Sequence, residues 1–189
     1  YKVCDWVSSL QREGAEVKVV MTKSAKKFVT PLTFAALTGN PAYRGMFAAR
    51  DEESIPHISL ARASDLILVA PATAQTIARL AHGMADDLLA AIVLASEAKI
   101  IVCPAMNSKM FLHAATQENI RKLREYGYHV LEPDSGMMAC GEEGPGRLPE
   151  WHQVRDAVIS SLIPQDLAGK TVLVTAGPTE EPLDPVRFL

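Results

Sequence analysis

The chain has 189 residues, of which 48% are hydrophobic and 22% charged, a composition typical of a globular protein. A net charge of −3 argues against a general nucleic-acid binder, and no apolar run approaches the roughly 20 residues that span a bilayer. Three cysteines without CxxC spacing favour a reducing cytoplasm over a disulfide scaffold or a zinc site. We therefore expect a cytoplasmic protein with no nucleic-acid or membrane partner and no bound metal.

Apolar residues recur at i, i+3, i+4 and i+7 between Val3 and Leu10, which predicts an amphipathic helix ending at Gly14. The chain starts at Tyr1, inside this helix and without an initiator methionine, so we expect an upstream segment. Predicted strands at 17–21, 66–70, 99–102 and 129–131 then alternate with predicted helices, including 24–39 (interrupted at Pro31), 88–95 and one that begins near Trp151. This alternation predicts an α/β fold of Rossmann or flavodoxin character: three layers, with a parallel sheet between helices.

The predicted helix at 88–95 is apolar on nearly every face, so we expect it to be buried, within the fold or against another subunit. Three polar turns, at 22–24, 71–76 and 104–107, each follow a predicted strand. Carboxyl ends of parallel strands share one edge of a sheet, and that edge binds ligands in open α/β folds. The turns offer hydroxyl, amide and backbone donors, which suit a flat uncharged ring with a phosphate tail, although hydroxyls there also cap helices.

Three single residues have competing interpretations. Asn107 follows the predicted strand at 99–102, where it is either a helix cap or a ligand contact. A lone histidine such as His57 is more often structural or exposed than catalytic. Cys140 lies among four glycines and a proline in residues 134–147, which predict either a mobile lid or an exposed loop with an incidental cysteine. Glycine-rich dinucleotide, P-loop and GxSxG motifs are absent from the sequence.

Several motifs together resemble the homo-oligomeric flavin-containing cysteine decarboxylases. They are Pro-Ala-Met-Asn-x-x-Met at 104–110, His-Ile-x-Leu at 57–60, Ala-Pro-Ala-Thr-Ala at 70–74, Gly-Met-Ala-Asp-Asp-Leu at 83–88 and Ala-Cys-Gly at 139–141. They occur in the family's order and cover roughly residues 1–160. In that family a strand and a Gly-Ser-type loop, which holds the FMN phosphate, precede the position of Tyr1. The tail, with Thr-Ala-Gly-Pro-Thr at 175–179 and Asp-Pro-Val-Arg at 184–187, resembles the start of a phosphopantothenate–cysteine ligase domain.

The resemblance implies a domain organisation and a reaction. Residues 1–162 would form an FMN-dependent cysteine decarboxylase domain, 163–169 a linker, and 170–189 the truncated start of a ligase domain that uses CTP and Mg²⁺. The reaction would be decarboxylation of 4'-phosphopantothenoylcysteine to 4'-phosphopantetheine in coenzyme A biosynthesis, through a thioaldehyde, loss of carbon dioxide and reduction of the enethiol. The alternatives are a peptidyl-cysteine decarboxylase, a flavin prenyltransferase and a non-catalytic regulatory subunit of the same fold.

The resemblance also implies roles for individual residues. Asn107 would hold the substrate carboxylate, Cys140 would donate a proton to the enethiol, and His57 would act as a base or an orienting group. Contacts to FMN would come from Thr22, Ser24, Thr73, Ala74, Gln75, Thr76 and Ala105. The substrate would contact Asn107, Met110, Ala139 and Gly141. Family members assemble as homotrimers, and the fused enzymes as dodecamers built from trimers.

Overall fold

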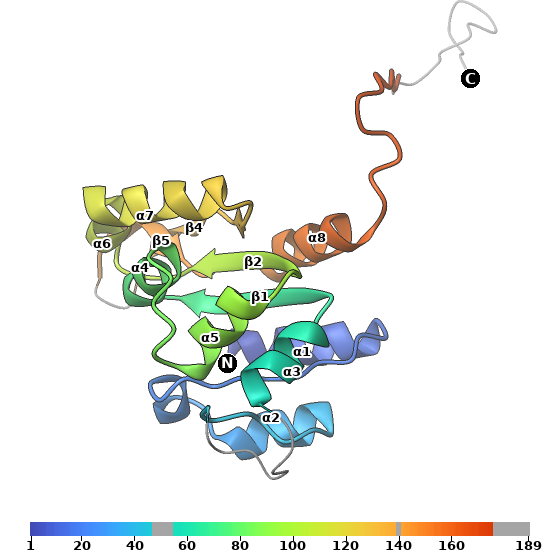
Figure 1. Cartoon of the computed structure of the whole chain (residues 1–189). Helices are drawn as coiled ribbons and strands as arrows, with labels where there is room; N and C mark the ends of the chain where they lie inside the picture. The colour runs from blue at the N-terminus through green and yellow to red at the C-terminus, as the bar shows by residue number, and fades with distance from the viewer. Residues whose placement is uncertain (47–54, 139–140, 176–189) are drawn as a thin grey trace, which may run out of the picture.

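The computed structural model describes residues 1–46, 55–138 and 141–175. Among these residues, a parallel sheet in the order β1-β2-β3 is formed by β1 (Leu66–Ala72), β2 (Lys99–Pro104) and β3 (His129–Val130). An antiparallel hairpin follows, formed by β4 (Asp134–Met137) and β5 (Glu143–Arg147). Figure 1 shows β1 and β2 running in the same direction between helices. The predicted α/β class is confirmed.

The helices connect the strands in the alternating order that the sequence predicts. Their bounds are α1 Lys2–Arg12, α2 Pro31–Thr38, α3 Pro56–Arg62, α4 Ala74–Ala81, α5 Leu88–Ala95, α6 Ser108–Leu112, α7 Ala114–Glu125 and α8 Trp151–Leu162, with a short 3-10 turn at Ala25–Lys27. Gly14, just beyond α1, has a φ of +92°, as expected for a residue that ends a helix. Of these helices, none is both long and apolar enough to cross a bilayer in the part of the chain that the structure describes.

Strand β2 shows why the fold has three layers. Ile100 and Val102 join a buried cluster with side chains of α4, α5 and α7. The intervening residues Ile101 and Cys103 join another cluster, with side chains of α1 and α8. Since successive side chains of a strand point to opposite faces, a continuous apolar strand requires cover on both sides. The predicted three-layer arrangement is therefore confirmed.

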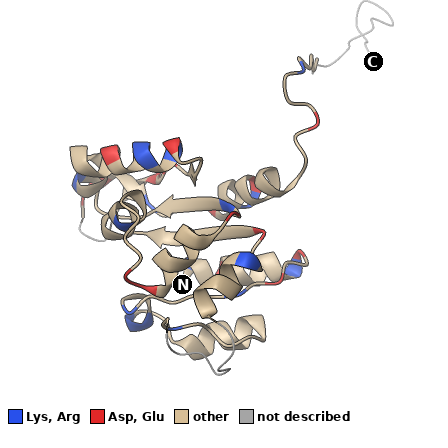
Figure 2. Cartoon of the chain, in the orientation of Figure 1, with Lys and Arg blue, Asp and Glu red and all other residues tan. Residues whose placement is uncertain are grey.

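Helix α5 has the predicted bounds and is largely buried. Asp87 caps it by accepting a hydrogen bond from the Ala90 amide at 2.9 Å. The helix carries no charged residue, in contrast to α7, which carries both acidic and basic side chains (Figure 2). Leu94 is nevertheless 60% exposed, so burial of every face of α5 is not complete within this chain.

One predicted strand is absent from the structure. Residues 17–21 form no strand, since Val20 makes only an isolated bridge to Tyr43. Instead, Val17, Val19 and Met21 pack with side chains of α1 and α2. Residues 170–175 are also irregular, and no described residue pairs with them. High β-propensity does not make a strand without a neighbour to share its backbone hydrogen bonds.

Two further elements differ from the prediction. Helix α3, which contains His57, forms at residues for which the sequence predicts no helix or strand. Its packing explains this, because Leu60 and Ala61 are buried against Leu88 and Ile92 of α5. The sequence predicts a loop at 134–147, but the described residues of this range form the β4–β5 hairpin.

Candidate functional site

The carboxyl ends of β1 and β2 lie together at one edge of the sheet. Ala72 is the register partner of Pro104, and the Ala105 amide donates a hydrogen bond to the Ala72 carbonyl at 2.9 Å. The turn that follows each strand begins a helix, α4 after β1 and α6 after β2. Two of the three predicted polar turns are therefore neighbours, as the parallel sheet required.

Asn107 uses both ends of its amide. Its Oδ1 accepts a hydrogen bond from the Lys109 amide at 2.9 Å, so Asn107 is the cap of α6. Its Nδ2 donates to Oε2 of Glu142 at 2.8 Å. Of the two interpretations that the sequence left open, the helix cap is confirmed, and the remaining donor contacts a carboxylate.

Glu142 reaches this position from the hairpin, 35 residues further along the chain. Its Oε1 also accepts a hydrogen bond from Nζ of Lys109 at 2.9 Å. The hydrogen bond from Lys109, followed by the one from Asn107, lowers the pKa of Glu142 below its usual range. The Asn107 amide therefore contacts an ionised carboxylate at neutral pH.

Glycines in the hairpin allow it to lie directly on the turn that follows β2. The Met106 amide donates to the Gly146 carbonyl at 2.9 Å, and a Cβ on Gly146 would lie 2.1 Å from the Met106 carbonyl oxygen. A Cβ on Gly144 would lie 2.5 Å from Oγ of Ser108. Both glycines have a positive φ, +155° for Gly144 and +141° for Gly146. Their role is close backbone approach, which a loop prediction from glycine content does not reveal.

A cavity of about 500 Å³ opens beside Asn107. Its lining includes Met106, Asn107, Met137, Met138, Arg147 and Leu148. Met110 is half exposed and Gly141 is exposed, and neither lines this cavity. The predicted catalytic Cys140 and the predicted substrate contact Ala139 lie outside the described residues. Burial raises the pKa of the Cys103 thiol to about 12, so Cys103 is a core residue and no substitute for Cys140.

The predicted FMN contacts occupy two capped turns. Oγ1 of Thr73 accepts a hydrogen bond from the Thr76 amide at 3.3 Å and caps α4, whose first residues are Ala74 and the exposed Gln75. Oγ1 of Thr22 likewise accepts from the Ala25 amide at 3.1 Å.

These groups are neutral hydroxyls, amides and backbone groups, with Ala105 beside the first turn and the exposed Ser24 in the second. This donor set fits a flavin ring and its phosphate ester. Among the described residues, no hydrogen bond or ion pair joins the turn at 22–24 to the other two turns.

His57 lies in the first turn of α3, and the structure does not bring it to the Asn107 cavity. Its Nδ1 is buried without a hydrogen-bond partner among the described residues. Buried polar atoms are nearly always paired, so an orphaned ring nitrogen marks a place where a further polar group fits.

The fold is that of an α/β protein in which neutral hydroxyl, amide and backbone groups gather where β1 and β2 end. A protein-family model described as Flavoprotein matches residues 1–163. A second model, for the C-terminal domain of DNA/pantothenate metabolism flavoproteins, matches residues 167–189. The chain belongs to the flavoprotein family.

Among curated proteins, the coenzyme A biosynthesis bifunctional protein CoaBC of Vibrio vulnificus (strain YJ016) is 48% identical over 189 residues, which cover 100% of this chain and 47% of the relative. CoaBC of Escherichia coli (strain K12) is 44% identical over 190 residues, with the same coverage of 100% and 47%. The chain thus spans about half the length of the curated relatives it matches.

Solved structures agree with the family. The FMN-dependent cysteine decarboxylase SpaF superposes with a TM-score of 0.73 at 32% identity, covering 85% of this chain and 86% of that one. A mutant of PPC decarboxylase complexed with pantothenoylaminoethenethiol has a TM-score of 0.75 at 26% identity, covering 84% and 89%.

Proposed function

We propose that this chain is the decarboxylase part of a bifunctional coenzyme A biosynthesis enzyme. It decarboxylates 4'-phosphopantothenoylcysteine to 4'-phosphopantetheine with FMN as cofactor. The identity of 44–48% to CoaBC proteins over the whole chain supports this substrate. The structural observation that carries the proposal is the Asn107 amide at the end of β2, which donates to a carboxylate while its oxygen caps α6.

The turns at the edge of the sheet hold the cofactor in this proposal. Thr22, Ser24, Thr73, Ala74, Gln75, Thr76 and Ala105 contact FMN through hydroxyl, amide and backbone groups. FMN, when bound, supplies the oxidation of the cysteinyl group and its later re-reduction. The chain orients the substrate beside it and binds the carboxylate that leaves.

Asn107 performs the central step by binding the substrate carboxylate through Nδ2. A neutral amide suits this task because a cation would stabilise the carboxylate in the ground state and oppose its loss. In the structure the same Nδ2 donates to Glu142. The substrate carboxylate therefore replaces the Glu142 carboxylate on the amide when it binds.

The other predicted residues complete the reaction. The Cys140 thiol gives a proton to the enethiol that remains after carbon dioxide leaves, and its ordinary pKa of about 8.5 makes it a competent donor at neutral pH. His57 acts as a base or an orienting group beside the cofactor. Met110, Ala139 and Gly141 contact the substrate.

The proposal extends to the chain's organisation. Residues 1–162 are the decarboxylase domain, 163–169 a linker, and 170–189 the start of a ligase domain that uses CTP and Mg²⁺. The match of residues 167–189 to the second family model supports that boundary. Assembly is as a homotrimer, or as a dodecamer built from trimers, and the protein acts in the cytoplasm.

Carbon dioxide release by the FMN-loaded protein tests the proposal. We expect turnover of 4'-phosphopantothenoylcysteine at least about tenfold faster than that of a peptide ending in cysteine. Cys140→Ser should release carbon dioxide while accumulating the enethiol, seen by mass spectrometry. Preference for the peptide would support the peptidyl-cysteine decarboxylase instead, and no release from either compound would support a non-catalytic role.

A further inference from the structure

Arg147 is a polar residue of the Asn107 cavity that none of the predicted roles uses. It lies at the end of β5, directly after Gly146, whose carbonyl accepts from the Met106 amide. Three methionines and Leu148 supply apolar side chains to the wall of the cavity, Lys2 supplies a second cation, and the cavity volume of about 500 Å³ is in the range of small-molecule sites. Because Lys2 is paired with Glu150, Arg147 is the cation of this wall that has no ion pair among the described residues.

Two carboxylates close to Arg147, those of Asp134 and Glu150, accept hydrogen bonds from other residues. Asp134, its register partner on β4, accepts a hydrogen bond from Nε2 of Gln153 at 3.1 Å. Glu150 lies 2.8 Å from Nζ of Lys2, which also lines the cavity. Within the part of the chain that the structure describes, the Arg147 side chain has no hydrogen bond or ion pair. The hydrogen bond and the charge of Lys2, followed by the charge of Arg147, lower the pKa of Glu150, while the hydrogen-bond donors of Arg147 remain for a ligand.

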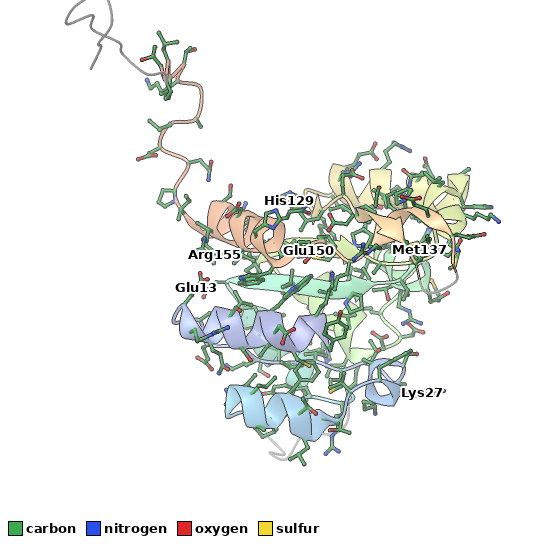
Figure 3. The ribbon with its side chains drawn as sticks, turned by 180° about the vertical axis from the view of Figure 1, so that it is seen from behind. Glu13, Lys27, His129, Met137, Glu150 and Arg155 are labelled. Carbon is green, nitrogen blue, oxygen red and sulfur yellow. The ribbon has the colours of Figure 1, made fainter. Side chains whose placement is uncertain are left out.

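Gly136 fixes where the guanidinium lies. A Cβ on Gly136 would be only 2.7 Å from Nη1 of Arg147 and 3.4 Å from its Cδ. The side chain thus lies across the hairpin against the backbone of β4, next to Met137. Figure 3 shows Met137 on the hairpin and Glu150 at the start of α8 on the same side of the molecule.

We propose that Arg147 binds the phosphate monoester of the substrate and so selects phosphorylated over unphosphorylated pantothenoyl compounds. The planar guanidinium matches a phosphate through two parallel hydrogen bonds. The phosphate does not change during decarboxylation, so a full positive charge there binds substrate without opposing loss of the carboxylate. This division of labour, with a neutral amide for the leaving carboxylate and a cation for the phosphate, rests on the proposed function.

Binding of two compounds that the decarboxylase cannot turn over tests the proposal: 4'-phosphopantetheine, the product, and pantetheine, its unphosphorylated form. Their affinities for the FMN-loaded protein are measured by isothermal titration calorimetry. We expect the wild-type protein to prefer the phosphorylated compound. Arg147→Ala should reduce that preference by about 10- to 100-fold, the effect of one charged hydrogen-bonding group, and Arg147→Lys should restore part of it. Arg155→Ala is the matched control, because Arg155 pairs with Glu13 at the opposite end of the molecule from Met137 (Figure 3).

Two outcomes would overturn the proposal. One is that Arg147→Ala lowers the affinity for both compounds by the same factor, which would indicate a structural role. The other is an unchanged preference with an FMN dissociation constant raised about tenfold, which would assign Arg147 to the phosphate of the cofactor. A wild-type protein that shows the expected preference but releases no carbon dioxide would support Arg147 and contradict the proposed function.

Discussion

The helices that follow β1 and β2 both begin with a side-chain cap, but the two caps make different contacts. At the end of β1, Thr73 caps α4, and its hydroxyl lies 3.2 Å from that of Thr76. At the end of β2, Asn107 caps α6 with its oxygen and donates its amide nitrogen to Glu142. Both residues satisfy orphan amides at a helix start, but only the second makes a long-range contact with a carboxylate.

This difference shows when a capping residue can also bind a ligand. A cap requires only an acceptor, so the donor of an asparagine amide remains available for a negatively charged group. The hairpin then determines which group that is, because it lies on Met106 and brings Glu142 to the amide. The chemistry at Asn107 thus depends on a segment far along the chain, whereas the Thr73 turn is built from adjacent residues.

The largest expected effect follows removal of the Asn107 donor. Asn107→Ala should lower kcat/KM for 4'-phosphopantothenoylcysteine by about 10²- to 10³-fold, the size of effect seen when one positioned donor is lost. FMN affinity should stay within about twofold, because the proposed cofactor contacts remain. Steady-state kinetics and flavin fluorescence titration measure the two quantities.

Asn107→Asp serves as the control because it keeps the oxygen that accepts from the Lys109 amide. It replaces the donor with a second carboxylate beside Glu142, so it should be as inactive as the alanine variant. An active aspartate variant would show that the cap, and not the donor, matters at this position.

The next largest effect concerns the position of the hairpin. Gly146→Ala places a Cβ where the Met106 carbonyl oxygen lies and strains a φ of +141°, so we expect a loss of about 3 kcal/mol in unfolding free energy. Urea denaturation measures it. Gly127→Ala, with a φ of +83° and no atom within 4 Å, is the control and should lose only about 1 kcal/mol. Equal losses would mean that the hairpin does not depend on close approach to Met106.

A smaller effect is expected at the other strand end. Thr73→Ala removes a helix cap and should lower stability by about 1 kcal/mol, with FMN binding weakened by about tenfold through loss of one hydrogen bond. Thr73→Ser retains the hydroxyl and should restore both. Weaker FMN binding in the serine variant as well would contradict a role of the hydroxyl.

The elements that the sequence predicts well are those whose signals are local. The apolar runs of β1 and β2 require burial on both faces, and α5 begins at an aspartate cap, so these elements are found where the pattern places them. Residues 17–21 carry an equally strong strand pattern but form none, because pairing is a non-local property.

The candidate site likewise has features that local sequence predicts and features that depend on the tertiary fold. Asn107 is recognisable as a cap from its neighbours, yet its contact with Glu142 depends on the tertiary fold. The sequence does not predict the hairpin, because a run of glycines usually indicates a loop. In the structure, Gly144 and Gly146 instead allow the hairpin to lie close to the segment that follows β2. Arg147 carries no local signal, since its significance comes from the cavity that the hairpin creates.

The smallest expected effect tests whether Glu142 competes with the substrate for the Asn107 amide. Glu142→Gln keeps an acceptor oxygen but loses the charge, and neutral hydrogen bonds are weaker than charge-assisted ones. We therefore expect the KM for 4'-phosphopantothenoylcysteine to fall about threefold with little change in kcat. Glu143→Gln, an exposed neighbour on β5, is the control. A higher KM in Glu142→Gln would instead assign Glu142 to holding the substrate.

The pH dependence of the KM difference between Glu142→Gln and the wild type provides a further test. Because Lys109 and Asn107 lower the pKa of Glu142 in the folded protein, its carboxylate is ionised above the ordinary unfolded value of about 4.3 and loses these contacts only as pH falls through the lower folded value. The KM ratio between Glu142→Gln and the wild type should thus be constant from about pH 6 to 8. A ratio that changed across that range would show that another titrating group controls access to Asn107.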